Sequence, residues 1–308
     1  MKSNKLYKMS SRRILLTGAG GYLGRNLALS LNNHFKVRAH YRHRENSAAE
    51  IESRSYGDLS ERGMTSSIID GVECVIHAAA IVPNSKNELV EKNFYSPNYE
   101  ISINLAQEAL KQGVQKFVFI SSANVYAPSS SVATEISTAG NFAKHPLYLQ
   151  SKLDAERDLL ELFSGKKSQL VILRIGTPYG CDEQNSKLIP LLMNQALKGQ
   201  NLTLSAPEQT ILNYIYMPDL IKAVVELITR DVNGIFNISN SFTLGVLAEE
   251  ILSLINSTSR VILSQDYYNS DARHFSKVSS EKLMKEIGYD FMTLRDSLRD
   301  YLSYVSAP

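Results

Sequence analysis

Tyr148 and Lys152 have the residue types and the spacing for proton transfer. Pro146 stands where a helix can begin, because the first helical turn does not need the N–H group that proline lacks. Residues four apart on a helix lie on the same face. A neighbouring cation favours the phenolate and lowers a tyrosine pKa that is otherwise about 10. The pair is therefore a candidate acid and base for a substrate oxygen, although the spacing also arises by chance in a chain with 16 tyrosines.

A glycine-rich segment, Gly18–Gly24, lies between a short apolar run at Arg13–Thr17 and a stretch with helical leucine spacing at Arg25–Asn32. Strand, glycine turn and helix in this order are the context of a dinucleotide-binding turn. The glycines let the backbone approach a pyrophosphate, and the start of the helix supplies free N–H groups and partial positive charge. The segment therefore predicts a phosphate-binding turn.

The end of the second expected strand, Phe35–Tyr41, indicates which dinucleotide is bound. An acidic residue there would bind the ribose 2′-hydroxyl of NAD, whereas an arginine would pair with the 2′-phosphate of NADP. Arg42 follows this strand, and the first carboxylate is Glu45. We therefore expect NADP, with NAD as the alternative if Arg42 is only a solvated loop residue. Asp58 lies near the end of a further expected strand, Ser55–Leu59, and we expect it to reach an adenine amino group.

Apolar runs that alternate with helical segments predict an α/β fold, a Rossmann doubly wound parallel sheet with a smaller C-terminal α/β substrate lobe. The later runs are Glu73–Ala80, Lys116–Ser122 and Leu170–Arg174, with a long helix at Glu88–Lys111. Ligands of such sheets bind at the carboxyl ends of the strands, so Ser122 and the helix of Tyr148 should face the crevice of the glycine turn.

The expected domains are a dinucleotide-binding domain at 10–180 and a substrate lobe at 181–308, with segments near 212–240 returning to the first domain. Helices of the lobe are expected at Ser186–Lys198, Pro218–Thr229, Leu244–Ile255, Ser280–Ile287 and Leu294–Tyr304.

Composition restricts the possible partners. The 308-residue chain is 44% hydrophobic with a net charge of +2, so we expect no nucleic-acid or membrane partner. Cys74 and Cys181 lie far apart and indicate neither a disulfide framework nor a cysteine-based metal site. The start of the chain has no signal-peptide pattern and no apolar run could span a bilayer, so we expect a cytoplasmic protein.

In this order, the motifs resemble those of the extended short-chain dehydrogenase/reductases, the branch of nucleotide-sugar epimerases, dehydratases and reductases. The resemblance runs from Ile14 to about Tyr301. The matching segments are Thr17–Gly24, Gly57–Leu59, His77–Ala80, Ser121–Tyr126, Tyr148–Lys152, Leu173–Gly180, Tyr214–Leu220 and Phe236–Ile238.

The resemblance implies a role for each matching residue. Tyr148 would be the acid/base, Lys152 would hold the nicotinamide ribose and lower the tyrosine pKa, and Ser122 would hydrogen-bond the substrate oxygen. The other residues that would contact the cofactor are Gly18, Gly21, Tyr22, Leu23, Gly24, Arg42, Asp58, Leu59, Ala78, Ala79 and Ala80. Beside Ser122 and Tyr148, the residues that would contact the substrate are Asn124, Thr177, Lys187, Leu188 and Arg273, and Lys187 and Arg273 could instead be solvated surface charges. Family members often form homodimers through helices corresponding to Glu88–Lys111 and Tyr148–Phe163.

Departures from the family pattern narrow the activity. Dehydratases of this family carry an acidic pair where this chain has Ala123 and Asn124, which argues against dehydration. Many epimerases have an asparagine where this chain has Thr177. A family Arg-Asp pair, whose arginine grips the diphosphate, is replaced by Leu212-Asn213.

Three functions follow from these residues. The first is an NADP-dependent reductase of a nucleotide-linked 4-keto-6-deoxysugar, with hydride from NADPH and a proton from Tyr148. The second is an NAD-dependent nucleotide-sugar 4-epimerase, which would retain its cofactor. The third is a non-catalytic NADP-binding regulator, which would usually have lost Tyr148 or Lys152.

Overall fold

The computed structural model describes residues 11–44, 51, 53–82, 92–142, 146–181, 187–264 and 275–305. The chain divides into two compact units. Unit 1 comprises Met1–Ser121, Leu147–Leu173 and Val224–Ile235, and unit 2 comprises Ser122–Pro146, Arg174–Ala223 and Phe236–Pro308. The chain thus passes between the units more often than the ranges 10–180 and 181–308 imply, and these ranges stay a prediction.

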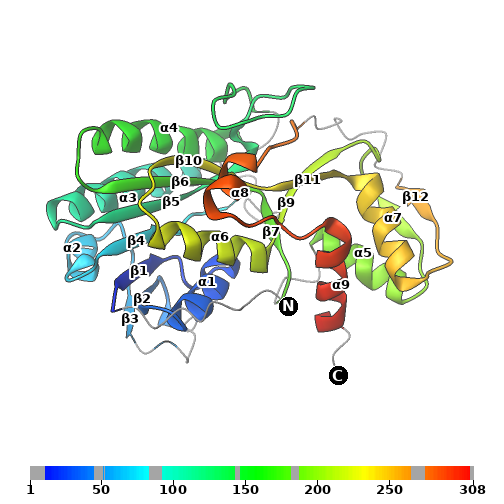
Figure 1. Ribbon diagram of the computed structural model, residues 1–308, viewed down its shortest axis with the longest axis horizontal. Coiled ribbons are helices and arrows are strands. Elements are labelled where there is room, and N and C mark those ends of the chain that lie inside the picture. Colours follow the sequence, from blue (N-terminus) through cyan, green and yellow to red (C-terminus); the bar gives the residue numbers. More distant parts are fainter. Residues whose placement is uncertain are drawn as a thin grey trace. The chain divides into compact units, whose positions relative to one another are not determined.

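A seven-stranded parallel sheet is built mostly from strands of unit 1. Its order is β10-β6-β5-β4-β1-β2-β3, and the labels in Figure 1 follow that order. The strands are β1 (Arg13–Thr17), β2 (Lys36–Tyr41), β3 (Ser53–Tyr56), β4 (Cys74–His77), β5 (Lys116–Ser122), β6 (Gln169–Ile175) and β10 (Gly234–Ile238). Since β1 lies between β2 and β4, the strand order reverses at this point, as the doubly wound fold requires.

Register aligns the ends of these strands at one edge of the sheet. Thr17 pairs with His40 of β2 and with His77 of β4, and His77 pairs with Phe119 of β5. The residues that follow β1, β2 and β4 therefore emerge side by side at the edge where doubly wound folds bind their ligands.

Helices cover the faces of this sheet because their apolar residues recur at helical spacing. They are α1 (Tyr22–Asn32), α2 (Met64–Ile69), α3 (Lys92–Lys111) and α4 (Pro146–Phe163). Alternate strand residues Leu15, Val75 and Phe117 form one apolar cluster with Ile68 of α2, Leu105 of α3, and Leu159 of α4. This cluster fixes α4, the helix that carries Tyr148 and Lys152, against the sheet.

Unit 2 has its own small sheets and core. Strands β11 (Asn240–Thr243), β9 (Ile211–Tyr216) and β7 (Thr177–Tyr179) form one sheet, and β12 (Val261–Leu263) pairs with β8 (Leu202–Leu204). The helices are α5 (Leu188–Leu197), α7 (Leu244–Ile255), α8 (Glu281–Ile287) and α9 (Leu294–Val305), and α6 (Met217–Thr229) begins in unit 2 and ends in unit 1. Ile189, Leu247 and Leu298 lie in the core of unit 2.

Candidate functional site

The glycine turn after β1 has the shape of a phosphate cradle. Gly18 has a φ of 74°, and a Cβ atom there would lie 2.6 Å from the Ala79 nitrogen. A Cβ on Gly24 would lie 2.0 Å from the Gly18 oxygen, so only glycine lets α1 approach the turn this closely. Gly21 caps α1 without a side-chain hydrogen bond, which leaves the first N–H groups of the helix for an anion. The turn therefore fits the pyrophosphate of a dinucleotide.

An ion pair closes the edge where β2 and β3 end. The Arg42 guanidinium lies 2.8 Å from the Asp58 carboxylate, and most of the Arg42 side chain is exposed. The N–H and hydroxyl groups of Ser60 both donate to Asp58, at 2.9 and 2.7 Å. These Ser60 bonds, together with Arg42, lower the pKa of Asp58. Arg42 thus already has a carboxylate partner within the chain.

The segment after β4 offers small side chains beside the glycine turn. Ala78, Ala79 and Ala80 are half-buried. Tyr22 and Leu23 of α1 are also half-buried, and Leu59 is almost fully buried. Unit 1 thus brings the predicted cofactor residues of the turn and of the β4 end into contact, since Gly18 packs directly on Ala78 and Ala79.

Tyr148 and Lys152 lie one turn apart on α4, as their spacing predicts. The Lys152 ammonium donates to the Ile120 carbonyl at 2.9 Å and lies 4.7 Å from the centre of the Phe119 ring. Burial lowers the pKa of Lys152 to about 8, against the opposing effect of Glu156. These contacts anchor the lysine at the end of β5, inside the unit that holds the glycine turn.

The lowered pKa predicted for Tyr148 is wrong for this structure. Burial raises the pKa of Tyr148 to about 12, and no effect of Lys152 offsets it. The half-buried ring loses stabilisation of its phenolate by leaving water, and this burial is the cause of the raised pKa. Near neutral pH the side chain is therefore a phenol, ready to donate a proton.

Glu156 is a buried acid that the sequence analysis missed. It lies four residues after Lys152 on the inner face of α4, and it accepts a hydrogen bond from the Ser121 hydroxyl. The spacing Tyr148, Lys152, Glu156 repeats every four residues, so the sequence did carry a signal for a third polar residue on this face.

The remaining predicted residues lie in unit 2. Ser122 ends β5, and its hydroxyl oxygen accepts from the Asn124 N–H at 3.2 Å. Thr177 is exposed on β7, Lys187 is exposed just before α5, and Leu188 is half-buried at the start of α5. Arg273 lies outside the described residues.

Asn213, which replaces a family acidic residue, has a structural role within unit 2. Its amide donates to the Ser276 carbonyl at 3.0 Å, and its oxygen accepts from the Ser241 hydroxyl at 2.6 Å. The side chain is buried and bonded at both ends, so it holds together segments of unit 2. The family residue that grips the diphosphate is the preceding arginine, and Leu212 in its place cannot do so.

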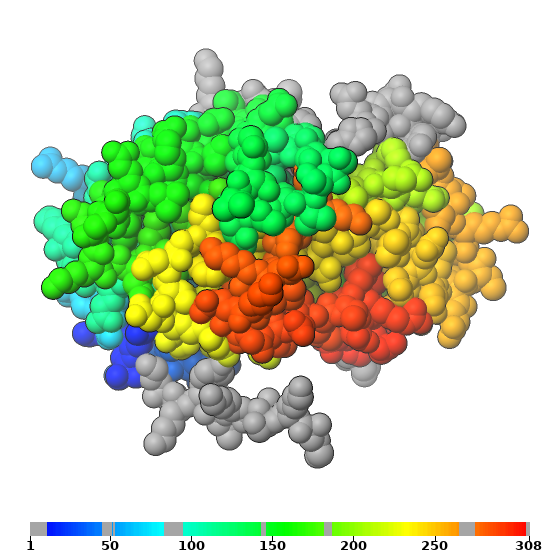
Figure 2. Space-filling view, turned by 45° about the horizontal axis from the view of Figure 1, so that its top comes forward, coloured from blue at the N-terminus to red at the C-terminus, as the bar shows by residue number. Residues whose placement is uncertain are grey.

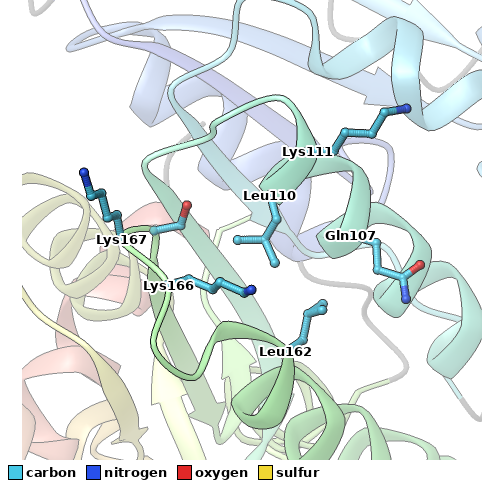
Figure 3. A pocket seen from close by; sticks show the side chains of 7 residues that line it. Gln107, Leu110, Lys111, Leu162, Lys166 and Lys167 are labelled. Carbon is cyan, nitrogen blue, oxygen red and sulfur yellow. The ribbon is translucent and has the colours of Figure 1, made fainter.

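A shallow pocket lies at the opposite edge of the sheet from the glycine turn. Its residues come from the ends of α3 and α4 and from the turn before β6: Gln107, Leu110, Lys111, Leu162, Lys166, Lys167 and Ser168. In Figure 3 the Lys166 side chain points toward Leu110 and Leu162. Since β6 begins just after this turn, the pocket is at the amino ends of the strands and is not part of the candidate site.

Two kinds of feature are absent from the described residues. Within them, no three His, Cys, Asp or Glu side chains gather where they could hold a metal ion. No helix among them is long and apolar enough to cross a membrane.

Comparisons with known proteins agree with this geometry. The chain is 27% identical over 235 residues to UDP-glucose 4-epimerase of Vibrio cholerae, covering 74% of this chain and 71% of that protein. It is 23% identical over 274 residues to dTDP-D-glucose 4,6-dehydratase of Dictyostelium discoideum, covering 79% of this chain but only 62% of that enzyme.

Solved structures show the same fold. UDP-glucose 4-epimerase of Thermotoga maritima, in complex with UDP-glucose, superposes with a TM-score of 0.82 at 17% identity, over 95% of this chain and 98% of that one. UDP-N-acetylglucosamine 4-epimerase of Methanobrevibacter ruminantium gives 0.82 at 21% identity, over 96% and 99%. The model of the NAD dependent epimerase/dehydratase family matches residues 14–239. The chain therefore belongs to this family and is an NAD(P)-dependent enzyme of the extended short-chain dehydrogenase/reductase type.

Proposed function

We propose that the protein is an NAD-dependent nucleotide-sugar 4-epimerase. The observation that carries the proposal is the placement of Tyr148 and Lys152 on one face of α4, with Lys152 anchored at the end of β5 in the unit that holds the glycine turn. Family membership and the 4-epimerases among its relatives support the same reading. They favour the epimerase alternative over the 4-keto reductase that the sequence analysis placed first.

The Arg42–Asp58 ion pair supports NAD rather than NADP. The reductase prediction depended on a free Arg42 for the 2′-phosphate, but this guanidinium already pairs with Asp58. A 2′-phosphate would have to compete with that carboxylate and would be repelled by it. Two solved structures of this fold, a UDP-glucuronic acid 4-epimerase and a dTDP-glucose 4,6-dehydratase, are complexes with NAD.

A dehydratase fits less well, although dehydratases are also among the relatives. The two positions after Ser122 carry Ala123 and Asn124, which lie in a short 3₁₀ turn. Neither side chain can donate and accept a proton as a carboxyl group can. The site therefore lacks an acid there to expel a hydroxyl group.

The chemistry of this chain's residues follows from their protonation states. When bound, the dinucleotide supplies a nicotinamide that accepts and returns hydride at C4. Because the resting Tyr148 side chain is a phenol, it would first give its own proton to solvent. The phenolate would then take the proton of the C4 hydroxyl as that carbon is oxidised, and the re-formed phenol would return it to the keto oxygen. Lys152 would stabilise the transient phenolate by its charge, and Ser122 would hydrogen-bond the same substrate oxygen.

We propose a UDP-hexose as the substrate class, on the strength of the relatives' names. Lys187 and Leu188 at the start of α5, together with Asn124, Thr177 and Arg273, remain the proposed substrate contacts. With Leu212 in place of the family arginine, a cation such as Lys187 would have to neutralise the diphosphate.

The test needs no added cofactor. The purified protein would be denatured and the released dinucleotide identified by mass spectrometry. A second sample would be incubated with UDP-glucose, UDP-N-acetylglucosamine or UDP-glucuronic acid, and the C4 epimer followed by proton NMR. We expect released NAD and epimer formation from at least one sugar. NADPH consumption with a 4-keto sugar nucleotide, without epimerisation, would instead establish the reductase.

A homodimer and a cytoplasmic location remain predictions. Figure 2 shows the outer side of α4, in green, at the surface of the molecule, and Arg157, Leu160 and Glu161 of this helix are exposed. Leu160 is 41% exposed, which leaves apolar area for a second copy of the chain. Sedimentation equilibrium at micromolar concentration should give twice the chain mass, and a monomer would contradict this interface.

A further inference from the structure

A buried chain of hydrogen bonds lies directly beneath the proposed cofactor turn. His77, the last residue of β4, is fully buried. Its Nδ1 atom lies 2.7 Å from the Thr17 hydroxyl and its Nε2 atom 3.0 Å from the Ser102 hydroxyl of α3. All three residues belong to unit 1. His77 thus links β1, β4 and α3 at the edge of the sheet where the glycine turn begins.

The neighbours of His77 define which of its nitrogens carries the proton. Ser102 donates its hydroxyl hydrogen to the Asn98 carbonyl at 2.6 Å, so it can only accept from Nε2. His77 is therefore protonated on Nε2, and Nδ1 accepts from the Thr17 hydroxyl. Thr17 in turn accepts from the Ala79 N–H at 3.3 Å. The chain runs in one direction, from Ala79 through Thr17 and His77 to Ser102 and Asn98.

The far end of this chain returns to the same loop. The Asn98 side-chain oxygen accepts from the Ile81 N–H at 2.8 Å, and its amide donates to the Ile81 carbonyl at 3.0 Å. Ala79 and Ile81 are thus held at two points by a network centred on His77. A buried network whose members are all satisfied is rigid, because each alternative arrangement leaves a polar group unpaired.

The loop that this network holds is the wall of the cradle. A Cβ on Gly18 would lie 2.6 Å from the Ala79 nitrogen and 2.7 Å from the Ala78 carbonyl carbon, so the turn and the loop are in direct backbone contact. A shift of the loop would therefore move or open the turn.

The same histidine is coupled to the candidate catalytic lysine through one ring. The His77 and Phe119 rings stack with their centres 6.0 Å apart, and the Lys152 ammonium lies 4.7 Å from the centre of the Phe119 ring. Burial and the nearby Lys152 lower the pKa of His77 to about 3. His77 therefore stays neutral and adds no charge that would repel Lys152.

We propose that His77 is a positioning residue for the dinucleotide: its two hydrogen bonds fix the loop 78–81 and thereby the shape of the Gly18 turn. This inference rests on the cofactor dependence of the family and not on the sugar substrate.

The experiment measures NAD affinity of the full chain after removal of any retained dinucleotide. His77→Phe keeps a ring but removes both hydrogen bonds, whereas His77→Gln keeps one donor and one acceptor. Leu159→Ala is the matched control, because it opens the core of the same unit without removing a hydrogen bond of the His77 network. Isothermal titration with NAD gives each Kd, and thermal unfolding shows that each variant is folded.

We expect His77→Phe to raise the Kd for NAD by about tenfold or more, because it breaks a buried hydrogen-bond network. His77→Gln should recover part of this loss. The Kd of Leu159→Ala should stay within about threefold of the wild-type value. An unchanged Kd in folded His77→Phe, or an equal loss in Leu159→Ala, would overturn the proposal. If His77→Phe does not fold, Thr17→Val and Ser102→Ala test the same chain from its two sides. If the hydrogen-bonded network acts as one unit, combining Thr17→Val with Ser102→Ala should cost less NAD affinity than the sum of the two single losses. Strictly additive losses would overturn the proposal.

The failure of this inference is distinguishable from that of the proposed function. Wild type that binds NAD but epimerises no sugar would remove the 4-epimerase proposal and leave the role of His77 intact. Wild type that binds neither NAD nor NADP would overturn the role of His77, since there would be no dinucleotide to position.

Discussion

In the proposed reaction, proton transfer depends on the Tyr148 hydroxyl, and Tyr148→Phe removes that one oxygen atom. Phenylalanine fills nearly the same space, and the stability of unit 1 should change by less than about 1.5 kcal/mol. We expect kcat to fall by about 10²- to 10⁴-fold, the range typical of a lost general acid or base. Proton NMR of the sugar epimers gives the rate, and urea unfolding gives the stability.

Tyr99→Phe is the control for this change. Tyr99 lies on α3 and donates its hydroxyl to Asp158, so it loses an equivalent group outside the proposed chemistry. Equal rate losses in the two variants would show that the Tyr148 hydroxyl acts only through stability.

In our proposal, Asp58 sets the preference for NAD over NADP, because its carboxylate pairs with Arg42 and repels a ribose 2′-phosphate. Asp58→Asn removes the negative charge and frees Arg42, while the amide oxygen can still accept the two Ser60 hydrogen bonds. We expect wild type to bind NAD more tightly than NADP. The variant should gain about tenfold in NADP affinity relative to NAD, the value of one charge-assisted hydrogen bond.

Titration calorimetry with both dinucleotides measures this ratio. Adding Arg42→Ala to Asp58→Asn should abolish the gain, whereas Arg54→Ala, another exposed arginine on the neighbouring β3, should leave the ratio unchanged. A wild type that already prefers NADP would restore the interpretation of Arg42 made from sequence.

At the scale of elements, the closest approach is between α1 and the turn before it. Gly24→Ala would place a Cβ 2.0 Å from the Gly18 oxygen, and the helix would have to move. We expect a loss of about 1–3 kcal/mol in unfolding free energy, as for other overpacked positions. Gly21→Ala is the matched control, because its Cβ would meet the same oxygen at an ordinary 3.5 Å and its φ is −81°. Similar urea midpoints for the two variants would contradict this packing argument.

Sequence patterns located the elements whose signal is local. Strands β1 and β5 and helix α7 have the predicted bounds. Helix α8 ends at Ile287, and Gly288 after it has the left-handed φ of 65° that favours glycine. Each carries its own signal: a continuous apolar run for the strands, helical apolar spacing for α7, and a terminal glycine for α8.

Elements and contacts that depend on distant partners could not be read in this way. The short strands β7, β8 and β12 have three residues each and become strands only by pairing. The Arg42–Asp58 pair joins the ends of two strands, and His77 meets Ser102 from a helix 25 residues later. The raised pKa of Tyr148 likewise depends on burial, which a four-residue spacing does not reveal.

At the scale of the whole molecule, we expect His77 to make the free energy of unfolding decrease as the pH is lowered. Its pKa of about 3 in the folded chain lies below the ordinary value of 6.5, so the unfolded chain binds more protons between these pH values. Stability is then fully present above about pH 6.5 and falls with decreasing pH, by up to about 1.4 kcal/mol per pH unit. Urea unfolding at several pH values should show a shallower slope for His77→Phe. An identical slope in the variant would mean that other groups account for the acid dependence.

The three separate stretches that make up unit 1 have a consequence for the order of biosynthesis. The last stretch, Val224–Ile235, belongs to the same unit as the first strand. On the ribosome, domains usually fold as they emerge. Unit 1 cannot be completed until more than two hundred residues have been translated, because its final segment begins at Val224. Most of the proposed substrate contacts are translated before that segment. A fragment that stops short of this segment would leave the edge of its sheet unfinished, so neither half is expected to be recoverable by simple truncation.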